Sequence, residues 1–110
     1  MLGLFENYSS TQENKKEKLS PLIIKNSPDN ILNIINKYLV ENSFEEIEKQ
    51  SNFYEIFAKK GVFEYTFQAI PNGLTSILNI YVFCEKKGKS RKELIKIRLL
   101  LKELFIEPTR

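Results

Sequence analysis

Two runs of alternating residues around a short turn constrain the fold of this chain more than any other feature. Residues 62–70 read VFEYTFQAI, so aromatic or small apolar side chains occupy every second position from Phe63 to Ala69. In the following run, residues 74–86, the side chains that share one face are Leu78, Ile80, Val82 and Cys84. Alternation of this kind is typical of strands, and the PNG between the runs favours a hairpin turn because Asn–Gly tolerates the left-handed conformation. The segment predicts an antiparallel hairpin with one apolar face that a second layer must cover.

The segment before this hairpin, NSPDNILNIINKYLVEN, has the pattern of an amphipathic helix. Ser27 is a good N-cap, and Pro28 suits the first helical position. The apolar residues that recur at helical spacing are Ile31, Ile34, Ile35, Tyr38 and Leu39. They predict a helix over about residues 28–41 with a single apolar stripe.

A second helix is predicted after the hairpin. Gly88 ends the strand, Ser90 can cap the helix, and Glu93 three residues later completes a capping box. The apolar stripe of this helix consists of Leu94, Ile97, Leu101, Leu104 and Phe105. We expect the helix to run to about Phe105, before Pro108.

Weaker signals complete the order of elements. Residues 21–25 predict a short edge strand and residues 53–60 a longer one. Residues 45–49 favour a short strand, although Phe44 and Ile47 also suit helical spacing. We therefore expect an α+β fold, a two-layer sandwich in the order helix, antiparallel meander of three or four strands, helix, with both helices on one sheet face.

Apolar residues are unevenly distributed along the 110-residue chain, which is long enough for one modest core. Residues 6–20, ENYSSTQENKKEKLS, are nearly devoid of apolar side chains and cannot bury enough surface to offset the entropy lost on ordering. We expect a flexible N-terminal arm over residues 1–20 and a single α+β domain over residues 21–107.

The residue inventory excludes several kinds of chemistry. The chain has no histidine and only one cysteine, Cys84, so it offers neither a Cys–His pair nor a structural zinc site. We expect no catalytic residue, no metal and no cofactor. No apolar run approaches the length of a membrane-spanning helix, and the N-terminus lacks the pattern of a secretory signal. A cytoplasmic protein without integral membrane association is expected.

Positive charge is concentrated near the second helix. The net charge is only +3, yet residues 86–102 hold eight lysines and arginines against the single acid Glu93. Basic side chains in such a block can contact an anion or a nucleic acid, and they can equally solvate a surface helix. The candidate contacts are Lys86, Lys87, Lys89, Arg91, Lys92 and Lys96.

The helix–strands–helix order over about residues 28–106 resembles a double-stranded-RNA-binding domain. The basic segment GKSRKELIK is similar to the lysine-rich helix start of that family. The resemblance implies phosphate contacts from Lys89, Arg91, Lys92 and Lys96. The chain departs from that family in three places: its second helix is not alanine-rich, its KKGV loop lacks the family's proline and histidine, and Ile95 stands where the last lysine is expected. We do not assign the chain to the family.

Two further groups of apolar residues predict surfaces for a protein partner. On the second helix, Ile95, Leu99 and Ile106 fall opposite the core stripe. On the strand before it, Ile77, Tyr81 and Phe83 point away from the helices. The hypothesis that follows is a small non-enzymatic binding or adaptor protein that acts by protein association, as a homodimer. The alternative is a nucleic-acid-binding module that uses the basic start of the last helix.

Overall fold

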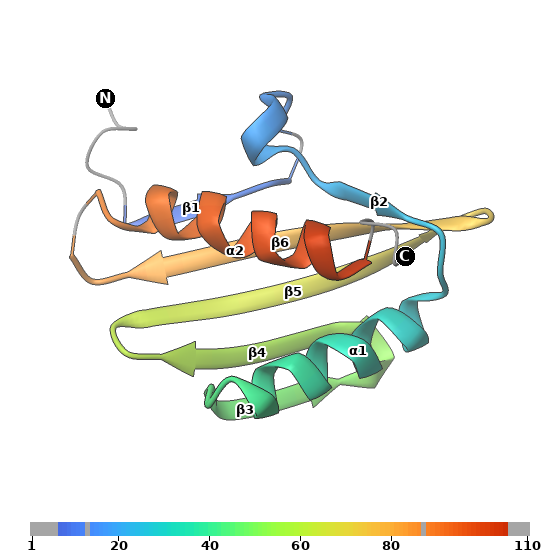
Figure 1. Cartoon of the computed structure of the whole chain (residues 1–110), viewed down its shortest axis with the longest axis horizontal. Helices are drawn as coiled ribbons and strands as arrows, with labels where there is room; N and C mark the ends of the chain where they lie inside the picture. The colour runs from blue at the N-terminus through green and yellow to red at the C-terminus, as the bar shows by residue number, and fades with distance from the viewer. Residues whose placement is uncertain (1–6, 13, 87, 106–110) are drawn as a thin grey trace.

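The structure is a computed structural model that describes residues 7–12, 14–86 and 88–105 (Figure 1). Its elements are β1 (Tyr8–Ser10), η2 (Glu17–Leu19), β2 (Leu22–Ile24), α1 (Pro28–Glu41), β3 (Glu45–Gln50), η3 (Ser51–Phe53), β4 (Glu55–Lys60), β5 (Phe63–Asn72), β6 (Thr75–Cys84) and α2 (Ser90–Phe105). Within the described residues, six strands form one antiparallel sheet.

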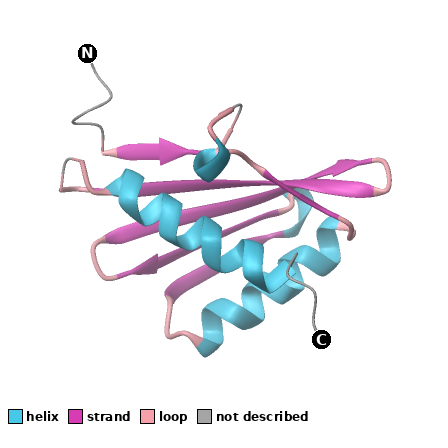
Figure 2. Ribbon diagram, turned by 45° about the horizontal axis from the view of Figure 1, so that its top comes forward, coloured by secondary structure: helices cyan, strands magenta, loops and turns pink. Residues whose placement is uncertain are grey.

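The two helices cover one face of this sheet and leave the other face open (Figures 1 and 2). The order β6–β5–β4–β3 is a meander of four strands, and β1 and β2 pair with different parts of the outer edge of β6. α1 lies over β3, β4 and β5, whereas α2 lies over β6 and β1. The predicted two-layer α+β sandwich is confirmed.

The core lies between the sheet and the helices, and the alternating hairpin supplies most of its sheet side. The buried apolar residues of this hairpin are Tyr65, Phe67, Ala69, Leu78, Ile80, Val82 and Cys84. The helices bury Ile31, Leu32, Ile35 and Leu39 from α1, and Leu94, Ile97 and Leu101 from α2. The period-two pattern of the sheet and the helical pattern therefore meet in the core as the sequence predicts. The prediction is wrong for Leu104, which is 44% exposed because it lines the open cavity between the two helices instead of the core.

The hairpin turn begins two residues later than predicted, at Gly73 instead of Pro71. Asn72 pairs with Thr75, so Pro71 and Asn72 belong to β5 and the turn is Gly73–Leu74. Gly73 has a φ of 68°, which glycine adopts without steric cost. The Thr75 hydroxyl donates to the carbonyl oxygen of Asn72 at 3.0 Å and helps to extend the ladder by this last pair.

The bounds of both helices are confirmed, but the predicted capping box of α2 is wrong. At α1, the Ser27 hydroxyl accepts a hydrogen bond from the Asn30 amide at 3.2 Å, as expected of an N-cap. At α2, Ser90 is already helical, and its hydroxyl lies 2.9 Å from that of Ser9. Glu93 points to the sheet instead and accepts a hydrogen bond from the Tyr65 hydroxyl at 2.5 Å. The pKa of Tyr65 is raised far above its usual value: burial of the hydroxyl has the largest effect, and the hydrogen bond to Glu93 adds to it.

Part of the segment predicted as a flexible arm is folded against the domain. β1 pairs with β6, the Thr11 hydroxyl accepts a hydrogen bond from the Ile80 amide at 2.9 Å, and Leu19 is buried in the core. Backbone pairing with the edge of β6 supplies the stabilisation that the few apolar side chains cannot. Residues 1–6 and Glu13 lie outside the described residues, as do residues 106–107 of the predicted domain.

The strand predicted near residues 45–49 is confirmed as β3, which forms one edge of the sheet. The pairing with β4 shifts between Glu45 and Glu48, and Glu46 adopts a φ of 50° inside this bulge. Bulges and charged side chains discourage pairing with a further strand. The exposed edge at β3 is therefore poorly suited to extending the sheet into another molecule.

Candidate functional site

The open face of the sheet carries a row of three isoleucines across three neighbouring strands. Ile23 of β2 pairs with Ile77 of β6, which pairs in turn with Ile70 of β5. Cross-strand partners lie on the same face of a sheet, and β6 turns its even-numbered residues to the core. Ile23 is 54% exposed and Ile70 is 38% exposed, with the half-buried Ile77 between them. We call these three residues the isoleucine row.

A second apolar group on this face is aromatic. Phe83 pairs with Tyr8 of β1, and the rings of Tyr8 and Tyr81 stack with their centroids 6.1 Å apart. The Tyr81 hydroxyl lies 3.2 Å from the side-chain oxygen of Gln12 and 3.3 Å from that of Gln68. Burial raises the pKa of Tyr81, and the neighbouring Tyr8 and Glu55 add to the shift. The aromatic group is held in place by polar contacts at its hydroxyl end.

Polar and acidic side chains separate and border these two groups. The row between them consists of Asn79, Gln68 and Glu55, paired across β6, β5 and β4. The remaining charged residues whose pairing places them on the open face are Glu45, Glu48, Lys59 and Glu64. The three predicted sheet contacts thus share one face, but Ile77 belongs to the isoleucine row whereas Tyr81 and Phe83 belong to the aromatic group.

The three apolar residues predicted on the outer side of α2 do not form a continuous exposed stripe among the described residues. Ile95 is half-buried and packs against the core, and Ile106 lies outside the described residues. Leu99 is 52% exposed. Two other leucines, Leu100 and Leu104, are exposed on the flank of α2 opposite Ile95. The structure therefore leaves Leu99 as the strongly exposed member of the predicted stripe.

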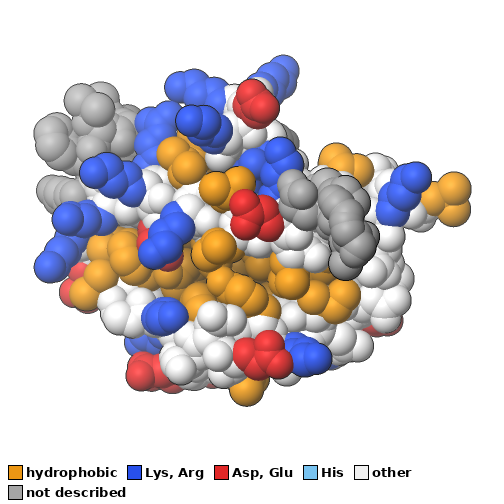
Figure 3. Space-filling model, viewed as in Figure 1, with side chains coloured by type: hydrophobic (Ala, Val, Ile, Leu, Met, Phe, Trp, Pro, Cys, Tyr) orange, Lys and Arg blue, Asp and Glu red, His pale blue; other side chains and the backbone are white. Residues whose placement is uncertain are grey.

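The candidate basic contacts are all exposed where the structure describes them. Lys86, Lys89, Arg91, Lys92 and Lys96 lie on or just before α2, and Lys87 lies outside the described residues. Three further exposed lysines, Lys15, Lys16 and Lys18, lie on or beside η2, which packs against α2. Figure 3 shows the resulting concentration of basic side chains over α2 and η2. We call these eight residues the basic surface.

Arg98 links the two segments that carry this surface, α2 and the segment that contains η2. Its Nε donates to the carbonyl oxygen of Ser20 at 2.5 Å, and one terminal nitrogen lies 3.1 Å from the Ser20 hydroxyl. Burial lowers the pKa of Arg98, and the negative charge of Glu17 opposes this shift in part. Arg98 is therefore a structural link and is not available to a ligand. Sequence reasoning missed Lys15, Lys16 and Lys18, because nothing local in the sequence indicates that this segment folds onto α2.

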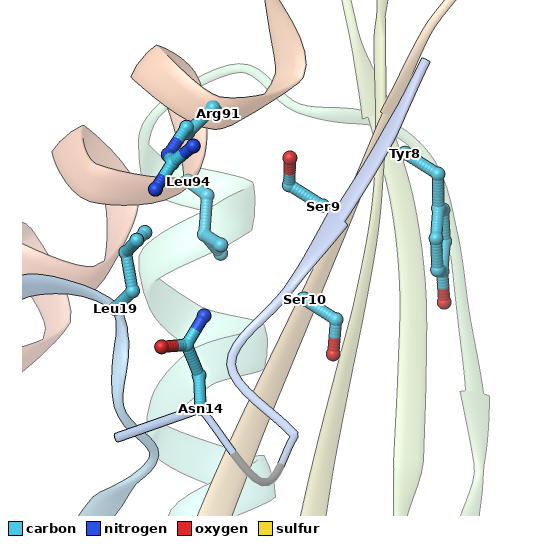
Figure 4. Close-up of a pocket in the computed structure, with 7 residues that line it drawn as sticks. All are labelled: Tyr8, Ser9, Ser10, Asn14, Leu19, Arg91 and Leu94. Carbon is cyan, nitrogen blue, oxygen red and sulfur yellow. The ribbon is translucent and has the colours of Figure 1, made fainter. Parts of the chain in front are cut away.

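Two of the cavities that the described residues form lie on the helix side of the sheet. The first, of about 290 Å³, lies between β1, η2 and α2 (Figure 4) and is lined by Tyr8, Ser9, Ser10, Asn14, Leu19, Arg91 and Leu94. The second, of about 280 Å³, lies between the two helices and is lined by Ile34, Lys37, Tyr38, Glu41 and Leu104. Apolar side chains are visible between the helices in Figure 3.

Comparisons with known proteins identify no relative. No family model, no curated protein and no solved structure matches this chain. Among the described residues, no cluster of three or more cysteine and acidic side chains could hold a metal ion. Neither described helix is both long and apolar enough to cross a membrane.

Proposed function

We propose that this chain is a small cytoplasmic, non-enzymatic binding protein that associates with a second copy of itself through the open face of its sheet. The isoleucine row carries this proposal. Ile23 and Ile70 are both substantially exposed, although isoleucine is among the residues most often buried in folded proteins. Burying a fully exposed isoleucine contributes roughly 1.5–3 kcal/mol, and because Ile23 and Ile70 are already partly covered, each contributes about half of that.

A second copy suits this surface because the apolar residues can pack against their own equivalents. In a two-fold symmetric dimer the same patch serves both copies. The acids of the open face, such as Glu48 and Glu64, lie in other rows than the isoleucines. A two-fold axis through the isoleucine row would therefore leave like charges at the rim, where solvent screens their repulsion.

Methyl resonances of the isoleucines offer a direct test. On dilution from near-millimolar to micromolar concentration, the δ1-methyl signals of Ile23, Ile70 and Ile77 should shift, because dissociation exposes them to water. The methyl signal of Ile35, which is fully buried in the core, should stay constant. Signals of the isoleucine row that do not depend on concentration would count against the dimer.

Binding to a nucleic acid is a second candidate function, and the joining of two distant basic segments by Arg98 favours it. Lys15, Lys16 and Lys18 extend the basic surface beyond the block evident in the sequence. Phosphate contacts by lysine supply sequence-independent affinity that falls as salt concentration rises. The acidic open face argues for the helix side as the contact surface.

Reversing two charges on this surface should weaken binding to an RNA duplex strongly. In the double variant Lys89→Glu with Lys92→Glu, we expect the affinity to fall by more than about tenfold and the slope of log affinity against log salt to fall by about 2, one for each lost contact. Fluorescence anisotropy at several salt concentrations measures both. The control is Lys25→Glu with Lys37→Glu, which makes the same charge change at exposed lysines outside the basic surface. Equal losses in both double variants would mean that net charge, rather than this surface, governs binding.

A further inference from the structure

The cavity between β1, η2 and α2 gathers polar side chains from segments far apart in the sequence. Ser9 comes from β1, Asn14 from the loop before η2, and Arg91 from the first turn of α2 (Figure 4). Tyr8 also borders the cavity, but its side chain points to the open face of the sheet, where it pairs with Phe83. The side chains on the helix side of β1 therefore set the chemistry of this cavity.

The side chains of Asn14 and Arg91 present hydrogen-bond donors to this cavity. The side-chain oxygen of Asn14 accepts from the Lys16 amide at 3.1 Å, so its NH2 group is the end left to meet a ligand. Arg91 contributes the five N–H donors of its guanidinium group and cannot accept a hydrogen bond. None of the lining residues is acidic. Within the described part of the chain, no carboxylate lies within ion-pair distance of Arg91.

The surroundings of these donors favour a negative charge. Leu19 and Leu94 are buried side chains that line the same cavity, and an apolar wall strengthens a polar contact beside it. Three exposed lysines, Lys15, Lys16 and Lys18, lie on the segment that forms one side of the cavity. They outnumber the exposed Glu17 of the same segment and leave a net positive potential. The donors of Asn14 and Arg91, a guanidinium group without an ion-pair partner among the described residues, and a positive rim together favour an anion over a cation or a neutral ligand.

We propose that this cavity is a binding site for a phosphate group. The planar guanidinium fork of Arg91 can meet two oxygens of a phosphate at once, and the Asn14 NH2 can reach a third. The Ser9 hydroxyl lies 2.9 Å from that of Ser90 and can donate to the phosphate when Ser90 is the donor of that pair. The group can belong to a small phosphorylated molecule or to a nucleic-acid backbone. The site goes beyond the proposed dimer, since it lies on the opposite side of the sheet and requires no second copy.

A titration with inorganic phosphate, followed by amide NMR at constant ionic strength against chloride, tests the site. We expect saturable shifts at the amides of Ser9, Asn14 and Arg91. Arg91→Gln should weaken phosphate binding by about tenfold or more, because it removes charge-assisted hydrogen bonds. Asn14→Asp should do the same by placing a carboxylate in the cavity. The matched control is Lys92→Gln, which removes one positive charge from the next residue of α2 without touching the cavity.

The outcomes separate a built site from general electrostatic attraction. Equal weakening by Arg91→Gln and Lys92→Gln would overturn the proposal, as would unchanged affinity in both Arg91→Gln and Asn14→Asp. Arg91 is exposed and Asn14 is half-buried outside the core, so melting curves close to that of the wild type should show that these variants still fold. A further titration with a short RNA duplex distinguishes the sources of the phosphate: loss of duplex binding in Arg91→Gln indicates the backbone, and duplex binding that Arg91→Gln leaves unchanged indicates a small molecule.

Discussion

Replacing Ile23 with glutamate should raise the dissociation constant of the dimer by more than about a hundredfold, since an unpaired charge buried in an interface costs roughly 3–5 kcal/mol. Ile23 lies at one end of the isoleucine row and is 54% exposed in the single chain. The change should therefore leave the fold of each copy intact while placing a carboxylate where two apolar faces meet. Sedimentation velocity at a series of concentrations measures the shift in the monomer–dimer equilibrium.

Leu99→Glu is the matched control for this experiment. Leu99 is 52% exposed, nearly the same as Ile23, but lies on the outer side of α2. Both variants add one negative charge at an exposed apolar position, and surface changes of this kind alter the free energy of unfolding by about 0.5 kcal/mol or less. If Leu99→Glu disrupts the dimer and Ile23→Glu does not, the interface lies on the helix, as the sequence also allowed, and the sheet-face proposal is wrong.

Phe67→Ala should lower the free energy of unfolding by about 3–5 kcal/mol. Phe67 is fully buried at the centre of the sheet, between its cross-strand partners Ile56 and Ile80, and its ring stacks 6.0 Å from that of Tyr65. Truncation leaves a cavity that these rigid neighbours fill only in part. Because small domains are stable by about 5–15 kcal/mol in total, the loss is a large fraction of the whole. Urea denaturation followed by circular dichroism measures it.

Phe53→Ala provides the comparison for this core substitution. Phe53 belongs to η3 and is 68% exposed, so its truncation removes the same atoms from a side chain that contributes little burial. We expect a change in the free energy of unfolding of about 0.5 kcal/mol or less. Similar losses at both positions would contradict the placement of the core between β5 and the helices.

The parts of the fold that could be predicted from sequence are those that depend on local pattern. The alternation over β5 and β6 identified the buried face, including Phe67 and Ile80, and helical spacing with the Ser27 cap identified α1. These signals are strong because each face is buried against a single partner layer. The sequence of β3 gives a weaker pattern, since this charged segment carries only Ile47 as a partly buried apolar residue.

The errors arose where distant parts of the chain decide the local structure. Ser90 and Glu93 match a capping box, but contacts with Ser9 and Tyr65 redirect both side chains. β1 forms because β6 offers an unpaired edge, which the polar sequence of the N-terminal segment does not reveal. The turn at Gly73 shifted because Asn72 and Thr75 form one more cross-strand pair.

The candidate surfaces were predictable only in part for the same reason. Ile77 was expected on the open face, yet its partners Ile23 and Ile70 come from strands whose register no local pattern specifies. The cavity at Arg91 likewise depends on how residues 14–20 fold back onto α2. A pattern can assign a residue to a face, but the neighbours that make a surface come from the topology.

The mass of the unmodified protein in solution tests the proposed association most directly. The chain has a mass of 12.9 kDa. In sedimentation equilibrium we expect the apparent mass to rise with concentration towards twice this value, and the rise should be absent in Ile23→Glu. A mass of 12.9 kDa that persists from micromolar to near-millimolar concentration would contradict self-association through the open face of the sheet.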